Sequence, residues 1–343
     1  MQDKFSEYYR ISNDEIQRHW EKDIFCFDAN VLLNLYRYTP KTRMAFLELL
    51  KQINDRIWIT YQAAFEYQKN RLLVINAQKE AYKDIRETLK KKKDEIETKL
   101  NGFKKHPYLQ AGELKRQIES AFQTISKDLD NLENKHPDYL EDDPIWDQLT
   151  VLLNGRVGDD FSKEELEKIY KDGKKRYDEK VPPGFMDAKD KQNEGNRSLY
   201  GDIIVWKQVM EKAKQIDNSI ILITDDLKED WWYKFKGKTI SPRIELIKEF
   251  REETNKRINI YQADRFLELA NKNLSQQTTK EAIQEVRDVR LADELDIEKQ
   301  IRDLEMFLED NGDDNFKENA RLIVVPEKSP FEKAIEGNIE SKK

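Results

Sequence analysis

Cysteine is almost absent from this 343-residue chain, because Cys26 is the only one. No internal disulfide can form, and three scattered histidines provide no Cys/His metal framework. No apolar run approaches the roughly 20 residues that a membrane-spanning helix needs. The N-terminal residues lack the basic stretch followed by an apolar stretch that marks a secretion signal. We therefore expect a cytoplasmic protein without a membrane partner.

The chain also lacks a net positive charge, since its formal charge is −7. The acidic excess belongs to the C-terminal part. Residues 281–343 carry 10 Lys and Arg against 18 Asp and Glu, whereas residues 1–280 carry 51 against 50. The first 280 residues are thus nearly neutral, which is compatible with a phosphate-rich substrate.

Four short runs rich in apolar and aromatic residues predict strands, each followed by a helical pattern or by turn residues. The runs are residues 24–27, 57–60, 220–223 and 258–261. Strands that are apolar on both faces and separated by helices favour a mainly parallel sheet covered on both sides. We therefore predict an α/β fold whose ligands bind beyond the carboxyl ends of the strands.

About 160 residues separate the second and third runs, far more than one crossover helix requires. Two heptad-like apolar stripes run through this segment, with Asn101-Gly102 and His106-Pro107 between them. We predict an antiparallel helical hairpin, inserted at about 76–180. The first stripe consists of Tyr82, Ile85, Leu89, Ile96 and Leu100, and the second of Ile118, Phe122, Ile125, Leu129 and Leu132.

The chain is expected to divide into a first domain of residues 1–275, which contains this insertion, and an acidic, mainly helical C-terminal extension of residues 276–343. Within the extension we predict a helix over residues 280–308 and a short strand at residues 322–325. Two roles for the hairpin stay open: it arches over the site and restricts entry, or it is an arm for dimerisation or for a partner protein. The extension either binds a partner or covers a basic groove.

Acidic side chains lie next to the predicted strands. Asp28 directly follows the first run, and Asp226 closes Thr224-Asp225-Asp226 after the third. Glu66 lies on the helix after the second run, and Asp202 near the start of the helix that leads into the third. Because parallel strands end at the same edge of a sheet, we expect these four acids to gather there.

Carboxylates that meet within a few ångströms repel one another unless a cation compensates them. Hard oxygen ligands favour Mg²⁺ or Mn²⁺, and a bound ion can activate water for attack on a phosphodiester. Taken singly, each acid has a simpler explanation as a helix cap, a turn former, a dipole partner or a solvated charge. The combination therefore carries the prediction of metal-dependent hydrolysis.

The order of four segments resembles the PIN-domain nucleases, and more closely the bacterial PIN-like branch with a long helical insertion. The segments are FDANVLL (27–33), AFEY (64–67), YGDIIVW (200–206) and ITDD (223–226). Three more are similar to that branch: PPGFMD (182–187), KEDWW (228–232) and SPRIEL (241–246). The resemblance covers about residues 20–270 and implies a three-layer α/β/α sandwich. It also implies Mg²⁺- or Mn²⁺-dependent phosphodiester cleavage, usually of RNA.

The resemblance also assigns roles to residues. Asp225 would help or replace its neighbour in the metal site, and Asp187 would be a further ligand or an outer acid. Asn30 would orient Asp28 or contact phosphate, and Thr224 would act similarly. The four residues implied as both catalytic and metal-binding are Asp28, Glu66, Asp202 and Asp226.

A basic segment between residues 171 and 197 precedes Asp202, with Tyr177, Phe185 and Tyr200 interleaved. Lysines can bind the backbone of a single strand while aromatic rings stack on its bases, although a solvated loop is the alternative. The predicted substrate contacts in this segment are Lys175, Arg176, Lys189 and Arg197.

The sequence thus predicts an endoribonuclease acting on RNA or single-stranded nucleic acid, with a toxin-like or defence role by analogy alone. A structure-specific or single-strand DNA nuclease is one alternative. A phosphatase of the haloacid dehalogenase type, with Asp28 as nucleophile, is another, but Asn30 stands where that family has a second Asp. A non-catalytic RNA-binding or scaffold protein is the third.

Overall fold

The central sheet consists of four strands in the order β2-β1-β3-β6, and all neighbouring pairs are parallel. The computed structural model describes residues 1, 4–9, 11–189, 191–274 and 277–292. All four predicted runs form strands, the second and fourth being shorter than expected, and the α/β prediction is confirmed. The strands are β1 (Ile24–Phe27), β2 (Ile57–Trp58), β3 (Ile220–Ile223) and β6 (Asn259–Tyr261).

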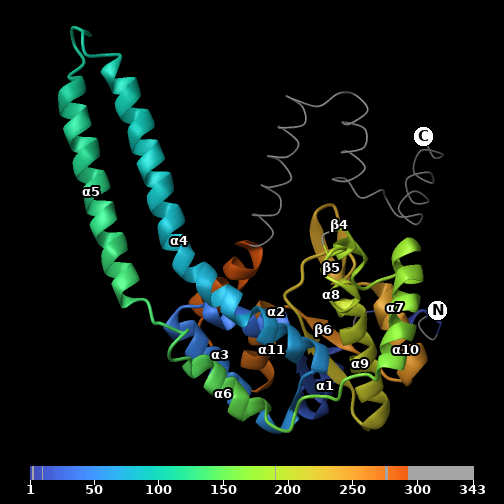
Figure 1. Cartoon of the computed structure of the whole chain (residues 1–343). Helices are drawn as coiled ribbons and strands as arrows, with labels where there is room; N and C mark the ends of the chain where they lie inside the picture. The colour runs from blue at the N-terminus through green and yellow to red at the C-terminus, as the bar shows by residue number, and fades with distance from the viewer. Residues whose placement is uncertain (2–3, 10, 190, 275–276, 293–343) are drawn as a thin grey trace, which may run out of the picture. The chain divides into compact units, whose positions relative to one another are not determined.

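Helices make up most of the remaining chain (Figure 1). Several begin as their sequences dictate: Ser12 and Ser162 form capping boxes, and Pro40 and Pro144 occupy first-turn positions. The helices are α1 (Asn13–Lys22), α2 (Ala29–Leu33), α3 (Pro40–Gln52), α4 (Tyr61–Asn101), α5 (Ala111–Lys135), α6 (Pro144–Leu153), α7 (Lys163–Asp178), α8 (Asn196–Leu199), α9 (Gly201–Gln215), α10 (Ile244–Thr254) and α11 (Ala263–Asn273).

An aromatic core fills the space between β1 and the helices α1, α3 and α11. The Phe266 ring of α11 lies at its centre, 5.4 Å from Phe27 and 5.8 Å from Phe25 between ring centroids. Trp20 of α1 stacks on Phe266 at 5.5 Å, and Phe46 of α3 lies 6.0 Å from it. Residues 25 and 27 share one face because side chains alternate along a strand.

Helix α9 is apolar around most of its circumference and is buried accordingly. Trp206 lies 5.8 Å from Phe250 of α10 and 6.3 Å from Trp231, and α9 also contacts α4 and α7. Such a helix has little freedom to move, so Asp202 in its first turn is held in a fixed place.

The predicted helical hairpin is confirmed as α4 and α5, which lie side by side in Figure 1. Ion pairs join the two helices, including Arg86 with Asp130 at 2.8 Å and Lys115 with Glu97 at 2.9 Å. Residues 76–138 are all described, and within them only Ala111 is buried. Helix α4 is one continuous helix, with Glu66 near its start and one arm of the hairpin in its C-terminal part.

A separate two-stranded antiparallel sheet follows β3 in the sequence. It pairs β4 (Trp232–Phe235) with β5 (Lys238–Pro242). No strand is predicted there from the sequence. Residues from 171 onward are expected to form a loop, whereas α7 extends to Asp178, because its Ser162–Glu165 capping box and its buried residues at helical spacing favour a helix.

Residues Met1–Val286 form one compact unit, and a second begins at Arg287. Residues 280–292 are helical, as predicted, and Glu285 accepts a hydrogen bond from Thr42 Oγ1 at 2.6 Å. The rest of the predicted helix to residue 308 and the strand at 322–325 lie outside the described residues. In the described part of the chain, no helix has the length and apolar character needed to cross a membrane.

Candidate active site

The carboxylate of Asp28 is held at the end of β1 by short hydrogen bonds. Thr224 Oγ1 donates to Asp28 Oδ2 at 2.8 Å, and the backbone N–H of Ala29 donates to Oδ1 at 2.7 Å. Asn30 Nδ2 donates to both Asp28 Oδ2 and Thr224 Oγ1, at 3.1 and 3.2 Å. Asn30 and Thr224 therefore orient Asp28, which is one of the two roles expected for them.

The adjacent acids Asp225 and Asp226 face different surroundings. Asp225 accepts hydrogen bonds from Asn34 Nδ2 at 3.0 Å and from the N–H of Ala263 at 2.9 Å, so it ties the end of β3 to the chain after α2 and to the start of α11. Asp226 instead accepts from Lys228, through the backbone N–H at 2.8 Å and through Nζ at 2.7 Å. Of the pair, Asp226 is the one that joins the acidic cluster.

Glu66 is held by a line of polar side chains. Gln62 Nε2 donates to Glu66 Oε1 at 2.8 Å, and Arg197 Nε donates to Gln62 Oε1 at 2.9 Å. Two further hydrogen bonds, at 2.8 and 2.9 Å, join the Arg197 guanidinium to Asp160. Arg197, expected to contact the substrate, thus donates its hydrogen bonds to Gln62 and Asp160 and positions Glu66 through Gln62.

Two glycines make room for the carboxylates. A Cβ atom at Gly201 would lie 2.5 Å from Glu66 Oε1, and one at Gly184 would lie 2.9 Å from the Cβ of Asp202. Gly184 also has a φ of +89°, a conformation that L side chains rarely adopt. Gly184 precedes a short 3-10 helix, Phe185–Asp187, and this turn brings Asp187 beside Asp202.

Two lysines enter the acidic cluster, and neither was predicted to lie at the metal site. Lys191 Nζ lies 2.6 Å from Asp187 Oδ2. Lys228 Nζ lies 2.9 Å from Asp187 Oδ1 and 2.7 Å from Asp226 Oδ2. Lys228 therefore bridges Asp187 and Asp226, which come from segments that lie far apart in the sequence.

The pKa shifts show that the acids share one electrostatic environment. Burial raises the pKa of Asp28, and the charge of Asp226 raises it further. Burial also raises the pKa of Glu66, with Asp28 adding to the shift. Burial raises the pKa of Asp202 well above its usual range. The positive charge of Lys191 lowers this pKa, whereas the charges of Asp187 and Asp226 raise it.

The lysines respond in the opposite direction. Burial opposes the charge on Lys228 and Lys191, yet the surrounding carboxylates raise the pKa of both ammonium groups. Asp187 is also buried, but Lys228 and Lys191 hold its pKa below the usual value. The lysines thus compensate the charge of Asp187, whereas at Asp202 they offset the effect of burial only in part.

A metal site is not preformed in this arrangement. Among the described residues, no three His, Cys, Asp or Glu side chains lie where they could hold an ion together. The donor chemistry nevertheless fits a hard divalent cation, since the cluster offers carboxylate oxygens. Asp202 Oδ2 is buried and has no hydrogen-bond partner, which leaves an acceptor that a cation would satisfy.

The remaining predicted substrate contacts lie outside this cluster. Arg176 is buried, and its guanidinium binds both carboxylate oxygens of Glu249 at 2.6 and 2.9 Å. It is therefore not accessible to a nucleic-acid substrate. Lys175 is exposed on α7, 3.9 Å from Glu179. Lys189 is exposed on the turn that follows Asp187.

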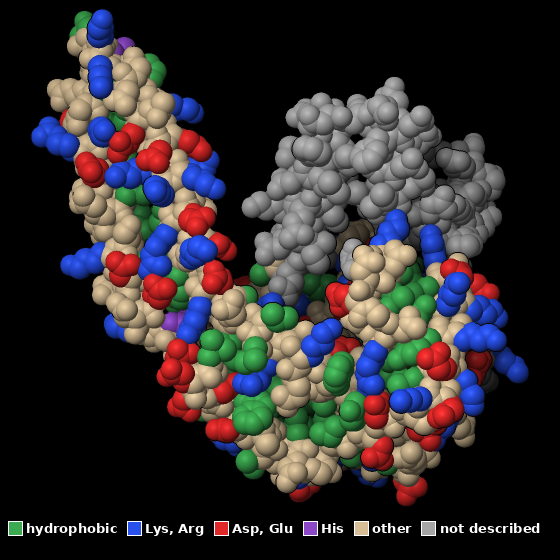
Figure 2. All heavy atoms as spheres, in the orientation of Figure 1, with side chains coloured by type: hydrophobic (Ala, Val, Ile, Leu, Met, Phe, Trp, Pro, Cys, Tyr) green, Lys and Arg blue, Asp and Glu red, His purple; other side chains and the backbone are tan. Residues whose placement is uncertain are grey.

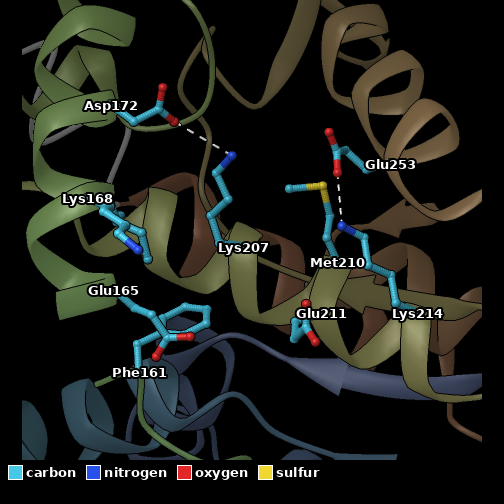
Figure 3. Close-up of a pocket in the computed structure, with 10 residues that line it drawn as sticks. Phe161, Glu165, Lys168, Asp172, Lys207, Met210, Glu211, Lys214 and Glu253 are labelled. Carbon is cyan, nitrogen blue, oxygen red and sulfur yellow. Dashed lines mark hydrogen bonds and ion pairs between the residues drawn. The ribbon is translucent and has the colours of Figure 1, made fainter. Parts of the chain in front are cut away.

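A groove of about 340 Å³ lies elsewhere, among α7, α9 and α10 (Figure 3). Two ion pairs join residues that line it, Lys214 with Glu253 at 2.9 Å and Lys207 with Asp172 at 3.6 Å. None of the predicted site residues lines it, and we assign it no role in the chemistry.

A comparison with known families covers the same part of the chain. The profile of a family described as PIN like domain matches residues 24–246, more than half of the chain. The chain belongs to the PIN-like domain family. No curated protein and no solved structure gives a significant match. The matched range of this PIN-like domain spans β1 to the start of α10, and it contains every acid of the cluster. PIN-like domains are generally nucleases that use divalent metals.

A further acid of this PIN-like domain, Asp230, interacts with Asp226 and Asp187 and was not predicted as a site residue. It is fully buried, and its Oδ2 accepts from the N–H of Met186 at 2.9 Å. Burial, followed by the charge of Asp226, raises the pKa of Asp230 to about 6. The sequence does offer a signal, because Asp230 lies in the KEDWW segment (228–232) that resembles the PIN-like branch.

We expect Asp230→Asn to change how stability depends on pH. The folded-state pKa lies above the unfolded value, so the folded chain holds this proton more tightly and loses that advantage as pH rises from about 4 through 6. At roughly 1.4 kcal/mol per pKa unit, the free energy of unfolding of wild type should fall by an amount on the order of 2 kcal/mol over this pH range. Asp230→Asn should lack this fall. Urea unfolding at pH 4.5 and 7.5 in EDTA measures it, with the exposed Asp94→Asn as control. Equal pH dependence in wild type and Asp230→Asn would contradict the assignment.

Proposed function

We propose that this PIN-like protein is a metal-dependent nuclease that hydrolyses phosphodiester bonds in RNA or single-stranded nucleic acid. The observation that carries the proposal is that four acids, at the ends of β1 and β3 and in α4 and α9, raise one another's pKa, with Asp202 Oδ2 left buried and unpartnered. Family membership supports the same conclusion, because PIN-like domains are generally nucleases.

The cation would be Mg²⁺ or Mn²⁺, and a bound ion would lower the pKa of a water and offset charge on the phosphate. Hydrogen bonds from Thr224, Asn30 and Ala29 hold Asp28 in one orientation. Gln62 does the same for Glu66. The residues that would hold the ion are Asp28, Glu66, Asp202 and Asp226.

Lys191 and Lys228 would compensate the carboxylates while no ion is bound. Both ammonium groups stay charged, because the acids around them raise their pKa. When a phosphodiester enters, the same two groups can pair with its oxygens, since a lysine ammonium is a mobile point charge. If the two ammonium groups moved from the carboxylates to the phosphate, the carboxylates would become available to the ion when the substrate enters.

We expect Asp202→Asn and Asp28→Asn each to reduce cleavage of labelled RNA by roughly a hundredfold or more, because each removes a proposed ion-binding charge. Wild type should cleave with Mg²⁺ or Mn²⁺ and should not cleave in EDTA. Asp94→Asn, an exposed change of the same kind on α4, should cleave as wild type does. Labelled DNA run in parallel reports the sugar preference.

Equal cleavage by wild type and both variants would refute the proposed site. Release of phosphate from small monoesters without strand cleavage would favour a phosphatase instead.

We further expect Gly201→Ala to separate positioning from folding. The new methyl group would displace Glu66 Oε1, which is the end of a flexible side chain, so the fold can adjust. Alanine in a helix is more stable than glycine by up to about 1 kcal/mol, so stability should not fall. Cleavage should drop roughly tenfold or more, as ion-binding geometry is lost. Gly112→Ala on α5, where nothing lies within 4 Å, is the control. Unchanged cleavage by Gly201→Ala would argue that Glu66 has no part in the reaction.

A further inference from the structure

The β4–β5 hairpin, residues 232–242, carries only positive charge in a chain whose overall charge is negative. We call these residues the basic ribbon. They include Lys234, Lys236 and Lys238 and no Asp or Glu, although the whole chain has 68 acids against 61 bases. Positive charge without interleaved acid is the electrostatic footprint expected of a surface that binds phosphates.

Apolar side chains are also exposed on the basic ribbon. Phe235 and Ile240 each have 51% of their surface exposed. The Nζ atom of Lys236 lies 5.6 Å from the centroid of the Phe235 ring, and Phe235 pairs with Lys238 across the two strands. An exposed aromatic ring between lysines provides a stacking face beside phosphate-binding groups, which is the combination that single strands require.

The basic ribbon is held in a defined shape despite its exposure. Its turn places Lys236 and Gly237 at φ values of +50° and +71°, as in the two-residue turns that match the twist of paired strands. The buried Trp232 anchors its base, because the indole N–H donates to the backbone carbonyl of Asp226 at 2.6 Å. The base of the ribbon is therefore fixed directly to an acid of the proposed active site.

The lysine-rich sides of the α4–α5 hairpin and of α7 carry acids among their bases. Figure 2 shows Lys and Arg mixed with Asp and Glu along the hairpin of α4 and α5. On α4, Lys93 lies 3.7 Å from Glu97, and on α7 Lys175 lies 3.9 Å from Glu179. By contrast, neither Lys236 nor Lys238 forms an ion pair with another described residue. Their charge is therefore available to a partner.

We propose that the basic ribbon binds a single strand of nucleic acid next to the acidic cluster, with Lys236 and Lys238 on the phosphates and Phe235 stacked on an unpaired base. This inference rests on the proposed nuclease function for its substrate. A strand is favoured over a duplex because the face of a base is free to stack only where it is unpaired.

The test compares binding of a fluorescently labelled 12-nucleotide single-stranded RNA by the full chain in EDTA, where no cleavage is expected. The double variant K236Q/K238Q should bind about tenfold more weakly in 0.1 M salt. The slope of log K against log salt should fall by about 1.4, because each phosphate that a lysine neutralises on a single strand adds about 0.7 to it. The control K90Q/K91Q removes the same charge from exposed positions on α4 and should bind as wild type does.

A second variant separates stacking from charge. F235A should weaken binding of the single strand severalfold, leave the salt slope unchanged and leave binding of a duplex of the same length unchanged. Thermal unfolding of all variants should match wild type, because the substituted side chains are exposed.

Hydrolysis of bis(p-nitrophenyl) phosphate with Mn²⁺ distinguishes the two proposals, because this small diester has no strand to hold. If ribbon variants hydrolyse it as wild type does and bind RNA more weakly, both proposals are supported. If they bind RNA with wild-type affinity and salt slope, or if K90Q/K91Q weakens binding as much, the ribbon proposal is overturned while the nuclease stands. Ribbon-dependent RNA binding without any hydrolysis by wild type would overturn the nuclease and support the ribbon as a binding surface.

Discussion

Burial of several carboxylates in one place is the constraint on which the rest of this structure depends. A parallel sheet brings the ends of β1 and β3 together, and α4 and α9 add their own acids to that edge. Like charges at short range would take up protons, and the raised pKa values of Asp28, Glu66 and Asp202 record that cost. Hydrogen bonds offset it at Asp28, whereas the lysines offset it at Asp187.

The surrounding fold keeps that arrangement rigid. Helix α9 is buried around most of its surface, so Asp202 cannot retreat to solvent without disturbing the core. Gly184 and Gly201 allow backbone to approach where any larger residue would displace a carboxylate. Asp225 fastens β3 to its neighbouring helices, which frees Asp226 to face the cluster. Residues that position the site, such as Asn30 and Asp225, therefore lie within two positions of the proposed ion-binding residues Asp28 and Asp226.

Much of this was predictable from the sequence, for reasons that differ between elements. The four strands followed from apolar runs and the α4–α5 hairpin from heptad spacing, because both signals are local. Lys191 and Lys228 were missed as partners of the acids, since a lysine in a polar loop looks the same in sequence whether it faces solvent or a carboxylate. Arg176 and Arg197 were expected at the substrate for the same reason, yet Glu249 and Asp160 bind them. The β4 strand alternates aromatic residues with lysines before Gly237, a pattern typical of a hairpin that was overlooked.

The central claim is that the acidic cluster is an ion site whose charge the lysines compensate in the absence of metal. A crystal structure of the full chain soaked with Mn²⁺, with data collected for anomalous scattering, tests it most directly. The account predicts one or more anomalous peaks bound by oxygens of Asp28, Glu66, Asp202 and Asp226, with Lys191 or Lys228 moved away from its present carboxylate. Saturating Mn²⁺ that gave no peak in the cluster, with both lysines still paired with their present carboxylates, would contradict it.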